Sequence, residues 1–404
     1  MPDPNVPEAP APSRNPGALA GAAFLMATSA IGPGFLTQTA FFTDSLRASF
    51  AFAILASVLV DLAVQANVWR ILGVARRRGQ ELASELLPGL GGVVAALVAA
   101  GGFVFNVGNI AGCGMGLEVL GLSQRWGALL SALMATGLLA LPRAGQAMDL
   151  FTKVLGGVMI ALTAGVMVVS KPDYLGALRG AFLPGQVAVL PVVTLVGGTV
   201  GGYITFSGVH RLLDAGIGGP GAVGRLTRAS ILGILVTAAM RVLLFLAILG
   251  VVSHAGSLDP ANPAASAFRL GAGEWGYRFF GVVLWSAAIT SVVGCSYTSL
   301  SFVRSFSPLL ERRSRQALAV FIGLSLLVYL GFGRPVSLLI LAGGLNGLIL
   351  PVTLGVVLLA ARRRDLMGEY RHPLTLQVVG WVAWGVSLLA GGFALKELAR
   401  LVRW

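Results

Sequence analysis

Apolar runs of about 20 residues recur along the chain and constrain its fold more than any other feature. A run of this length suits one helical crossing of a lipid bilayer. Of the 404 residues, 56% are hydrophobic and 11% are charged, whereas a soluble domain is typically about 25% charged. The sequence therefore predicts an all-α integral membrane protein of about eleven transmembrane helices. Their expected limits are 18–46, 49–74, 91–117, 126–142, 151–169, 188–212, 229–252, 275–302, 316–331, 336–361 and 375–398.

The positive charge is placed as in a membrane protein. The net charge is +13, and most arginines form short clusters between apolar runs, as the positive-inside rule expects. We therefore expect the lipid bilayer as a partner and no nucleic acid. The two cysteines, Cys113 and Cys295, fall within expected spans and give neither a disulfide framework nor a metal-ligand spacing. The sequence contains no nucleophile–base arrangement, nucleotide loop or redox motif, so we expect no enzyme and no cofactor.

The arginine clusters also predict the orientation of the chain. The clusters at 76–78, 312–315 and 362–364 fall on one side of the expected spans, and the more basic side is normally cytoplasmic. This places the N-terminus in the cytoplasm and, with an odd number of spans, the C-terminus outside a plasma or inner membrane. Residues 1–16 are polar and rich in proline, which predicts a disordered cytoplasmic tail.

Two glycine-rich stretches interrupt apolar runs and predict broken helices. Gly32-Pro33-Gly34-Phe35 lies inside the first run, and 197–202 lies inside the sixth. Proline removes a backbone donor, and glycine carries no side-chain restraint. In lipid such breaks survive only where protein buries them or where they line a cavity. Two interrupted spans at matching places in two halves point to a transporter binding site.

Matching breaks also predict an internal repeat. We expect a single transmembrane domain over 17–404, in which repeat one covers about 17–170 and repeat two about 187–361, with an extra helix at about 375–398. Because the first five spans start inside and the next five start outside, the two repeats are expected to be inverted.

Several short motifs connect the chain with a known family. From Gly21 it reads GAAFLMATSAIGPGF, and further matches lie at 62–65, 106–109, 198–200, 290–297 and 350–351. With these motifs the chain resembles the NRAMP family of proton-coupled divalent-metal transporters. The resemblance implies a LeuT-type fold with a 5+5 inverted repeat, broken helices 1 and 6, and transport by alternating access.

The chain departs from this family at the positions that handle metal and protons. Gly32 and Phe35 stand where the family has Asp and Asn ligands, and 201–203 (Gly-Gly-Tyr) stands where it has Met-Pro-His. Asn106 and Asn109 replace two carboxylates of the third span, and Ile349 replaces a Gln of the tenth. None of the family's usual metal ligands is retained.

These replacements change the chemistry of the site. A divalent cation exchanges its water only for enough oxygen, nitrogen or sulfur donors, and Gly and Phe side chains offer none. An Asn side chain cannot take up and release a proton near neutral pH, so the two asparagines cannot form a carboxylate relay. The scaffold is kept, and we expect either a substrate other than the transition metals typical of the family or metal handling by a different site.

The candidate substrate-binding residues surround the two breaks and the third span. Gly and Pro breaks also occur as packing kinks, the aromatic rings also suit ordinary apolar packing, and the asparagines also suit interhelical hydrogen bonds. Thr37 and Gln38 are the better candidates for direct contact. The full set is Gly32, Pro33, Gly34, Phe35, Thr37, Gln38, Asn106, Asn109, Gly201, Gly202 and Tyr203.

Other polar residues within the spans suggest an ion site or a proton relay. Thr290, Ser291 and Ser296 belong to a hydroxyl-rich eighth span, which suits either small-residue packing or a sodium site near the first break. Asp61 and Arg241 are intramembrane charges, which are functional candidates by default. Asp61 either pairs with Arg241 or takes the missing proton role.

Three functions remain open on the sequence. The first is a secondary transporter of metal or other cations that uses carbonyls and hydroxyls in place of the missing ligands. The second is a transporter of a small organic solute, coupled to sodium or a proton or uncoupled, which the missing ligands favour. The third is a non-transporting membrane sensor, which the absence of an appended soluble domain makes less favoured.

Overall fold

The computed structural model describes residues 16–140, 144–304 and 306–403, and within these ranges the chain is helical without any strand. The predicted tail at 1–16 lies outside the described residues except for Pro16. The helices are α1 (Pro16–Ala30), α2 (Pro33–Leu46), η1 (Arg47–Ser49), α3 (Phe50–Ala75), α4 (Gly79–Leu86), α5 (Leu90–Val119), α6 (Gln124–Ala140), α7 (Ala144–Ser170), α8 (Tyr174–Phe182), α9 (Val189–Val200), α10 (Ile204–Asp214), η2 (Pro220–Ala222), α11 (Val223–Ala255), α12 (Pro263–Arg304), α13 (Pro308–Arg312), α14 (Ser314–Phe332), α15 (Pro335–Ala360), α16 (Arg364–Met367) and α17 (Leu374–Arg403).

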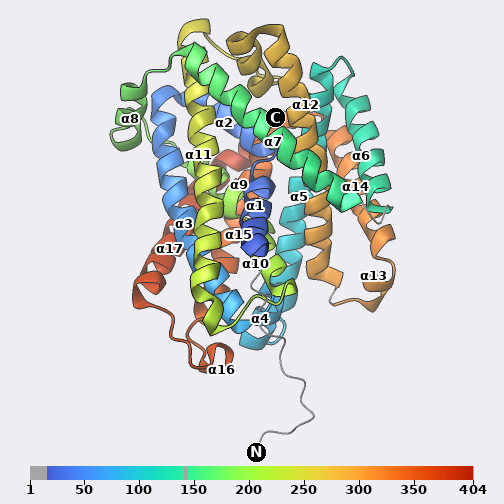
Figure 1. The fold of residues 1–404 in the computed structure, drawn as a ribbon, viewed down its shortest axis with the longest axis vertical. Helices are drawn as coiled ribbons and strands as arrows, with labels where there is room; N and C mark the ends of the chain where they lie inside the picture. Colours follow the sequence, from blue (N-terminus) through green and yellow to red (C-terminus); the bar gives the residue numbers. More distant parts are fainter. Residues whose placement is uncertain (1–15, 141–143, 305, 404) are drawn as a thin grey trace, which may run out of the picture.

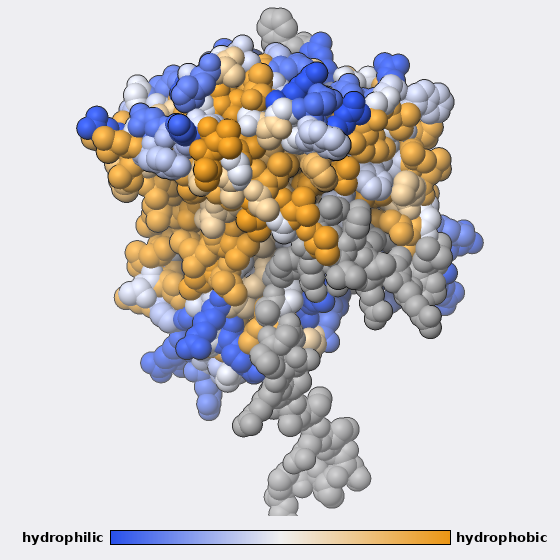
Figure 2. All heavy atoms as spheres, turned by 45° about the horizontal axis from the view of Figure 1, so that its top comes forward, coloured by the Kyte–Doolittle hydropathy of each residue, from blue (hydrophilic) through white to orange (hydrophobic). Residues whose placement is uncertain are grey.

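Apolar side chains form a band across the face of the molecule drawn in Figure 2. Figure 2 shows apolar residues over the middle of the surface and hydrophilic residues toward its two ends. Large apolar side chains of the outer helices point away from the core, such as Leu327 on α14 and Phe393 on α17, which are 64% and 72% exposed. Because lipid replaces water as the surrounding solvent, such exposure is expected of a multi-pass membrane protein.

The predicted count of eleven spans is not confirmed. Among the described residues, eight helical segments are long and apolar enough to cross a membrane. A ninth is added if Gly156–Ser170 and Tyr174–Phe182, bent by 106°, form one span. Each of the eleven expected runs overlaps a helix. The shortfall arises because α1 and α6 have only 15 and 17 residues, fewer than the about 20 of an ordinary span, and because α2 and α3 run on as one segment.

The two broken helices occupy the middle of the bundle. α1 lies at the centre of Figure 1. α1 packs on α10 and α11, while α2 packs on α11, α12 and α15. α9 packs on α3, α15 and α17. Both predicted breaks are therefore held on several sides by other helices.

The arginine clusters lie toward one end of the bundle. α4, which follows Arg76–Arg78, and α16, which follows Arg362 and Arg363, lie together at the lower end in Figure 1, whereas α8 lies at the upper end. This grouping is the one expected from the sequence.

Candidate functional site

The first break separates α1 from α2 at Ile31 and Gly32. Gly32 has an extended backbone (φ −105°, ψ −171°) and offers no side-chain cap, and Pro33 opens α2. Proline suits this first helical position because its missing N–H would have had no intrahelical partner. Pro33, Gly34 and Phe35 are all buried. The start of α2 is thus a helix N-terminus without a side-chain cap, held inside protein.

The second break separates α9 from α10 at 201–203. Gly201 is extended and Gly202 has φ +54°, a left-handed conformation that favours glycine. A Cβ at Gly202 would collide with the side chain of Asn346 on α15. Tyr203 packs edge-on against Phe105 of α5, with ring centroids 5.9 Å apart. Glycine at 202 therefore lets α10 approach α15 closely.

Two predicted residues meet at the first break. An ideal Cβ placed on Gly32 would lie 3.3 Å from Ser291 Oγ of α12 and 3.8 Å from Asn109 Oδ1 of α5. The structure thus brings Gly32, Asn109 and Ser291 together. All three groups are neutral, so Gly32, Asn109 and Ser291 bring no full charge to the break.

Asn106 is held elsewhere. Its Nδ2 donates to Ser325 Oγ of α14 at 3.1 Å, whereas its Oδ1 is buried without a partner. Thr290 Oγ1 and Ser296 Oγ donate to carbonyls of their own helix. Of the three hydroxyls predicted for an ion site, Ser291 is the one that faces Gly32.

Gln38 links α2 to two neighbouring helices. Its Nε2 donates to the carbonyl of Leu339 on α15 at 2.7 Å. A Cβ on Gly198 of α9 would lie 3.3 Å from its Oε1, and this oxygen has no partner. Thr37 Oγ1 is likewise buried without a partner. Buried polar atoms normally find partners, so these two predicted contact residues offer unused hydrogen-bonding capacity beside the breaks.

Asn346 is a site residue that was not predicted from the sequence. Its Nδ2 donates to the carbonyls of Gly101 and Ala342 at 3.0 and 2.9 Å. Its Oδ1 has no hydrogen-bond partner and lies against Gly202. The available signal was one amide within the apolar run of α15, four residues before Leu350-Pro351.

A buried charged group lies beside both breaks. Arg241 of α11 is 1% exposed, and its Nη1 donates to Thr199 Oγ1 near the end of α9 at 3.1 Å. Its guanidinium carbon lies 4.3 Å from the ring centroid of Phe35 in α2. Asp61 of α3, also 1% exposed, interacts with both Thr199 and Arg241. Thr199 thus stands between the two intramembrane charges.

Among the described residues, one cavity adjoins the first break and another lies beside α10, the helix that follows the second break. The first, of 620 Å³, is apolar and reaches the first break at Ile31; it lies between α1, α7, α11 and α12, where Met159, Met240 and Val283 contribute to its wall. The second, of 330 Å³, lies between α10 and α12 and carries Arg78, Arg211 and Arg304 against a single acid, Asp214. Phe35 and Arg241 line neither cavity.

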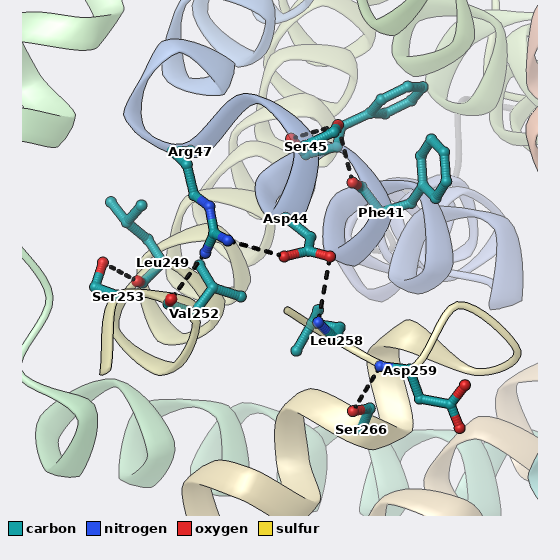
Figure 3. Close-up of polar contacts among 11 residues, drawn as sticks. Phe41, Asp44, Ser45, Arg47, Leu249, Val252, Ser253, Leu258, Asp259 and Ser266 are labelled. Carbon is teal, nitrogen blue, oxygen red and sulfur yellow. Dashed lines mark hydrogen bonds and ion pairs between the residues drawn. The ribbon is translucent and has the colours of Figure 1, made fainter. Parts of the chain in front are cut away.

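A polar clamp ties the far end of α2 to the end of α11 and the loop that follows it. Asp44 accepts from the backbone N–H of Leu258 at 3.3 Å and pairs with Arg47 at 3.4 Å. Arg47 Nη1 donates to the carbonyl of Val252 at 2.8 Å. Figure 3 shows the Asp44 carboxylate between Arg47 and Leu258. The clamp joins α2 to the neighbouring helix and loop beyond the first break.

The donor set around the breaks is poor in anionic ligands. Among the described residues, no group of three or more His, Cys, Asp or Glu side chains could hold a metal ion. The breaks offer backbone carbonyls, amides and hydroxyls, and the nearby Asp61 already interacts with Arg241.

The chain is similar in sequence to a known family and to a known membrane protein. Residues 23–395 match the sequence model of the natural resistance-associated macrophage protein-like family (Nramp). An uncharacterized membrane protein of Bacillus subtilis (strain 168), YcsG, is 52% identical over 378 residues, which cover 93% of this chain and 94% of that protein.

Solved transporter structures share the fold. A manganese transporter of Eremococcus coleocola superposes with a TM-score of 0.75 at 16% identity, covering 94% of this chain and 86% of the other. Inward-facing Mhp1 gives 0.62 at 14% identity, covering 94% and 91%. MhsT in complex with L-phenylalanine gives 0.60 at 14% identity, covering 94% and 98%. At such identities the likeness shows the fold alone, and it confirms the predicted LeuT-type architecture.

Proposed function

The chain belongs to the Nramp family of membrane transporters, and from this premise we propose that it carries a small organic solute, not a divalent metal ion, by alternating access. The observation that carries the proposal is the set of side chains at the breaks. Gly32 and Phe35 flank the first break, and glycines and Tyr203 form the second. Neither break supplies the carboxylate oxygen or thioether sulfur donors that a metal ion needs.

The electrostatics support the same choice. A guanidinium near Phe35 and Thr199 repels a cation, and in a low-dielectric interior this repulsion is stronger than in water. Phe35, Tyr203 and the apolar cavity at Ile31 suit an organic solute. Its volume of 620 Å³ lies within the about 300–1,000 Å³ of small-molecule pockets.

The fold accommodates both classes of substrate. The Eremococcus coleocola relative in fold is a manganese transporter, whereas MhsT is solved with L-phenylalanine. A divalent metal ion is therefore the second candidate, favoured by family membership. In our proposal the solute lies between the broken helices, beside Gln38, Asn109 and Ser291, with α5 and α12 as walls.

The membrane setting is proposed as follows. The chain lies in the plasma or inner membrane with its basic end in the cytoplasm. Repeat one covers about 17–170 and repeat two about 187–361, with the helix at about 375–398 outside the repeats. The clamp around Asp44 then faces outward, and the cavity with the three arginines faces inward. Sodium at Ser291 or a proton at Asp61 supplies the coupling.

Calorimetric titration of the purified protein with manganese, cadmium and magnesium, with and without sodium, tests this proposal. We expect no binding heat, because the breaks carry no anionic ligand of their own. Micromolar binding of any of these metals that is lost in Asp61→Asn would overturn the proposal and return the protein to metal transport. The Glu369→Gln variant, which alters an exposed carboxylate outside the spans, is the matched control.

A further inference from the structure

We propose that the transported solute is an organic anion and that Arg241 binds its carboxylate between the two broken helices. This inference rests on the proposed function and specifies the substrate class of the same site.

The position of Arg241 relates it to both breaks. Its guanidinium lies over the ring of Phe35, two residues after Pro33 opens α2. It also donates to Thr199, two residues before the extended Gly201. A solute held between the broken helices would therefore lie within reach of this group.

The unused part of the guanidinium matches a carboxylate. Nη1 is occupied by Thr199, whereas Nε and Nη2 are buried and have no hydrogen-bond partner. Nε and Nη2 form one edge of the planar fork, the geometry that accepts both oxygens of a carboxylate in parallel hydrogen bonds. Leaving such donors unpaired in a buried site is costly, so this edge is suited to a ligand.

The internal acid does not occupy this edge. Asp61 and Arg241 lie within the described part of the chain and form no ion pair with a nitrogen–oxygen distance of 4.0 Å or less. Asp61 Oδ1 also has no hydrogen-bond partner. Thr199 lies between them. Asp61 balances the charge of Arg241 from a distance, and the carboxylate of a solute can bind the guanidinium directly. A purely structural ion pair would be expected to close into contact, because contact offsets the desolvation of both charges.

The basic cavity suits the same sign of charge. Arg78, Arg211 and Arg304 line it, and Asp214 is the one acid among its lining residues. Arg78 Nη2 pairs with Asp214 at 2.7 Å, so two guanidinium groups are in excess. Positive potential in a cleft raises the local concentration of anions and lowers that of cations.

Retention of matched solutes tests the inference. Full-length protein in detergent is equilibrated with an equimolar mixture of three acids and their amides. The acids are lactate, phenylacetate and phenylalanine. The amides, in which an uncharged carboxamide replaces the carboxylate, are lactamide, phenylacetamide and phenylalaninamide. The solutes that stay bound after rapid desalting are measured by mass spectrometry. We expect the acids to be retained over their amides. Retention should fall about tenfold or more in Arg241→Gln, because the bidentate contact is lost, and partially in Arg241→Lys, which keeps the charge without the fork.

Two control variants separate recognition from folding. Arg70→Gln alters another arginine of the spans, whose Nε and Nη2 both bind Thr227 Oγ1, and should retain the acids as the wild type does. The double variant Asp61→Asn/Arg241→Gln removes both buried charges, so that neither is left uncompensated. Loss of acid retention in this folded double variant shows that the guanidinium is needed for binding.

The outcomes distinguish the two proposals. Equal retention of amides and acids, or unchanged retention in Arg241→Gln, overturns the anion inference while the organic-solute transporter stands. No retention of any solute together with metal binding overturns the proposed function as well. Measuring the melting temperature of the wild type at increasing chloride concentration tests for an inorganic anion. A melting temperature that rises with chloride, with no acid retained, overturns the carboxylate assignment.

Discussion

Gly202 determines how closely the second broken helix can approach α15. Its φ of +54° lies in the left-handed region, which costs a residue with a Cβ roughly 1–2 kcal/mol. In addition, a Cβ there meets the side chain of Asn346, which already donates to Gly101 and Ala342. Backbone conformation and packing therefore both require glycine at this position.

Gly202→Ala should accordingly destabilise the protein more than a Gly→Ala substitution at a position that has a positive φ but free space for a Cβ. Gly216 has φ +73°, and a Cβ at this position would meet nothing within 4 Å, so Gly216→Ala should cost about 1 kcal/mol. For Gly202→Ala we expect about 1–3 kcal/mol beyond that, from overpacking against Asn346. Thermal unfolding of both variants in the same detergent measures the difference. Equal losses would mean that Asn346 moves aside freely.

At the scale of elements, the breaks were predictable because their signal is local. Glycine and proline restrict or release the backbone wherever they occur, so 32–35 and 197–202 could be identified without a partner. Asn106 and Arg241 could be identified as unusual for the same reason. Asp61 could be suggested as a partner for Arg241, but the residue that pairs with Asn106 could not be predicted. Asn106 pairs with Ser325, 219 positions away, and one polar residue in an apolar run says nothing about which helix will face it. Thr199 and Asn346 were not predicted as site residues for the same reason.

The loop before α17 docks on α3 through a neutral histidine. His372 is buried, and its Nε2 lies 2.7 Å from Asn67 Oδ1. Because Asn67 Nδ2 already donates to the carbonyl of Ala63, the imidazole must be the donor in this pair. The Tyr370 hydroxyl lies 3.3 Å from Nδ1, where it can donate to the other ring nitrogen. Burial, and then the nearby Arg70, lower the pKa of His372 from 6.5 to about 4.

This docking predicts a pH dependence of stability. The pKa of His372 is lower in the folded protein than in the unfolded protein. The contribution of His372 to the free energy of unfolding is therefore complete above about pH 6.5 and declines as the pH falls toward about 4. After discounting for screening at the membrane boundary, we expect a loss of about 1–2 kcal/mol. Comparing the melting temperature of wild type and His372→Gln between these pH values isolates this histidine from the other two. A constant difference across the range would contradict the docking role.

At the scale of the whole molecule, charge is separated along the bundle. The band of apolar side chains lies between two hydrophilic ends (Figure 2), and α4 and α16, which adjoin arginine clusters, share one of them (Figure 1). Arg78, the last residue of the cluster before α4, also lines the basic cavity between α10 and α12. An anion leaving the breaks toward this end would meet increasing positive potential, so the orientation of the bundle determines on which side of the membrane that solute is attracted.

The orientation can be tested with two cysteine reporters. Both native cysteines are buried, so background labelling by a membrane-impermeant maleimide should be low. Leu183, 80% exposed between α8 and α9, should react in intact cells as Leu183→Cys. Glu369, exposed after α16, should react as Glu369→Cys only once the membrane is permeabilised, because the positive-inside rule predicts that the end with the neighbouring arginines is cytoplasmic. The reverse pattern would place the three-arginine cavity outside, where it would collect anions for uptake instead of receiving them within the cell.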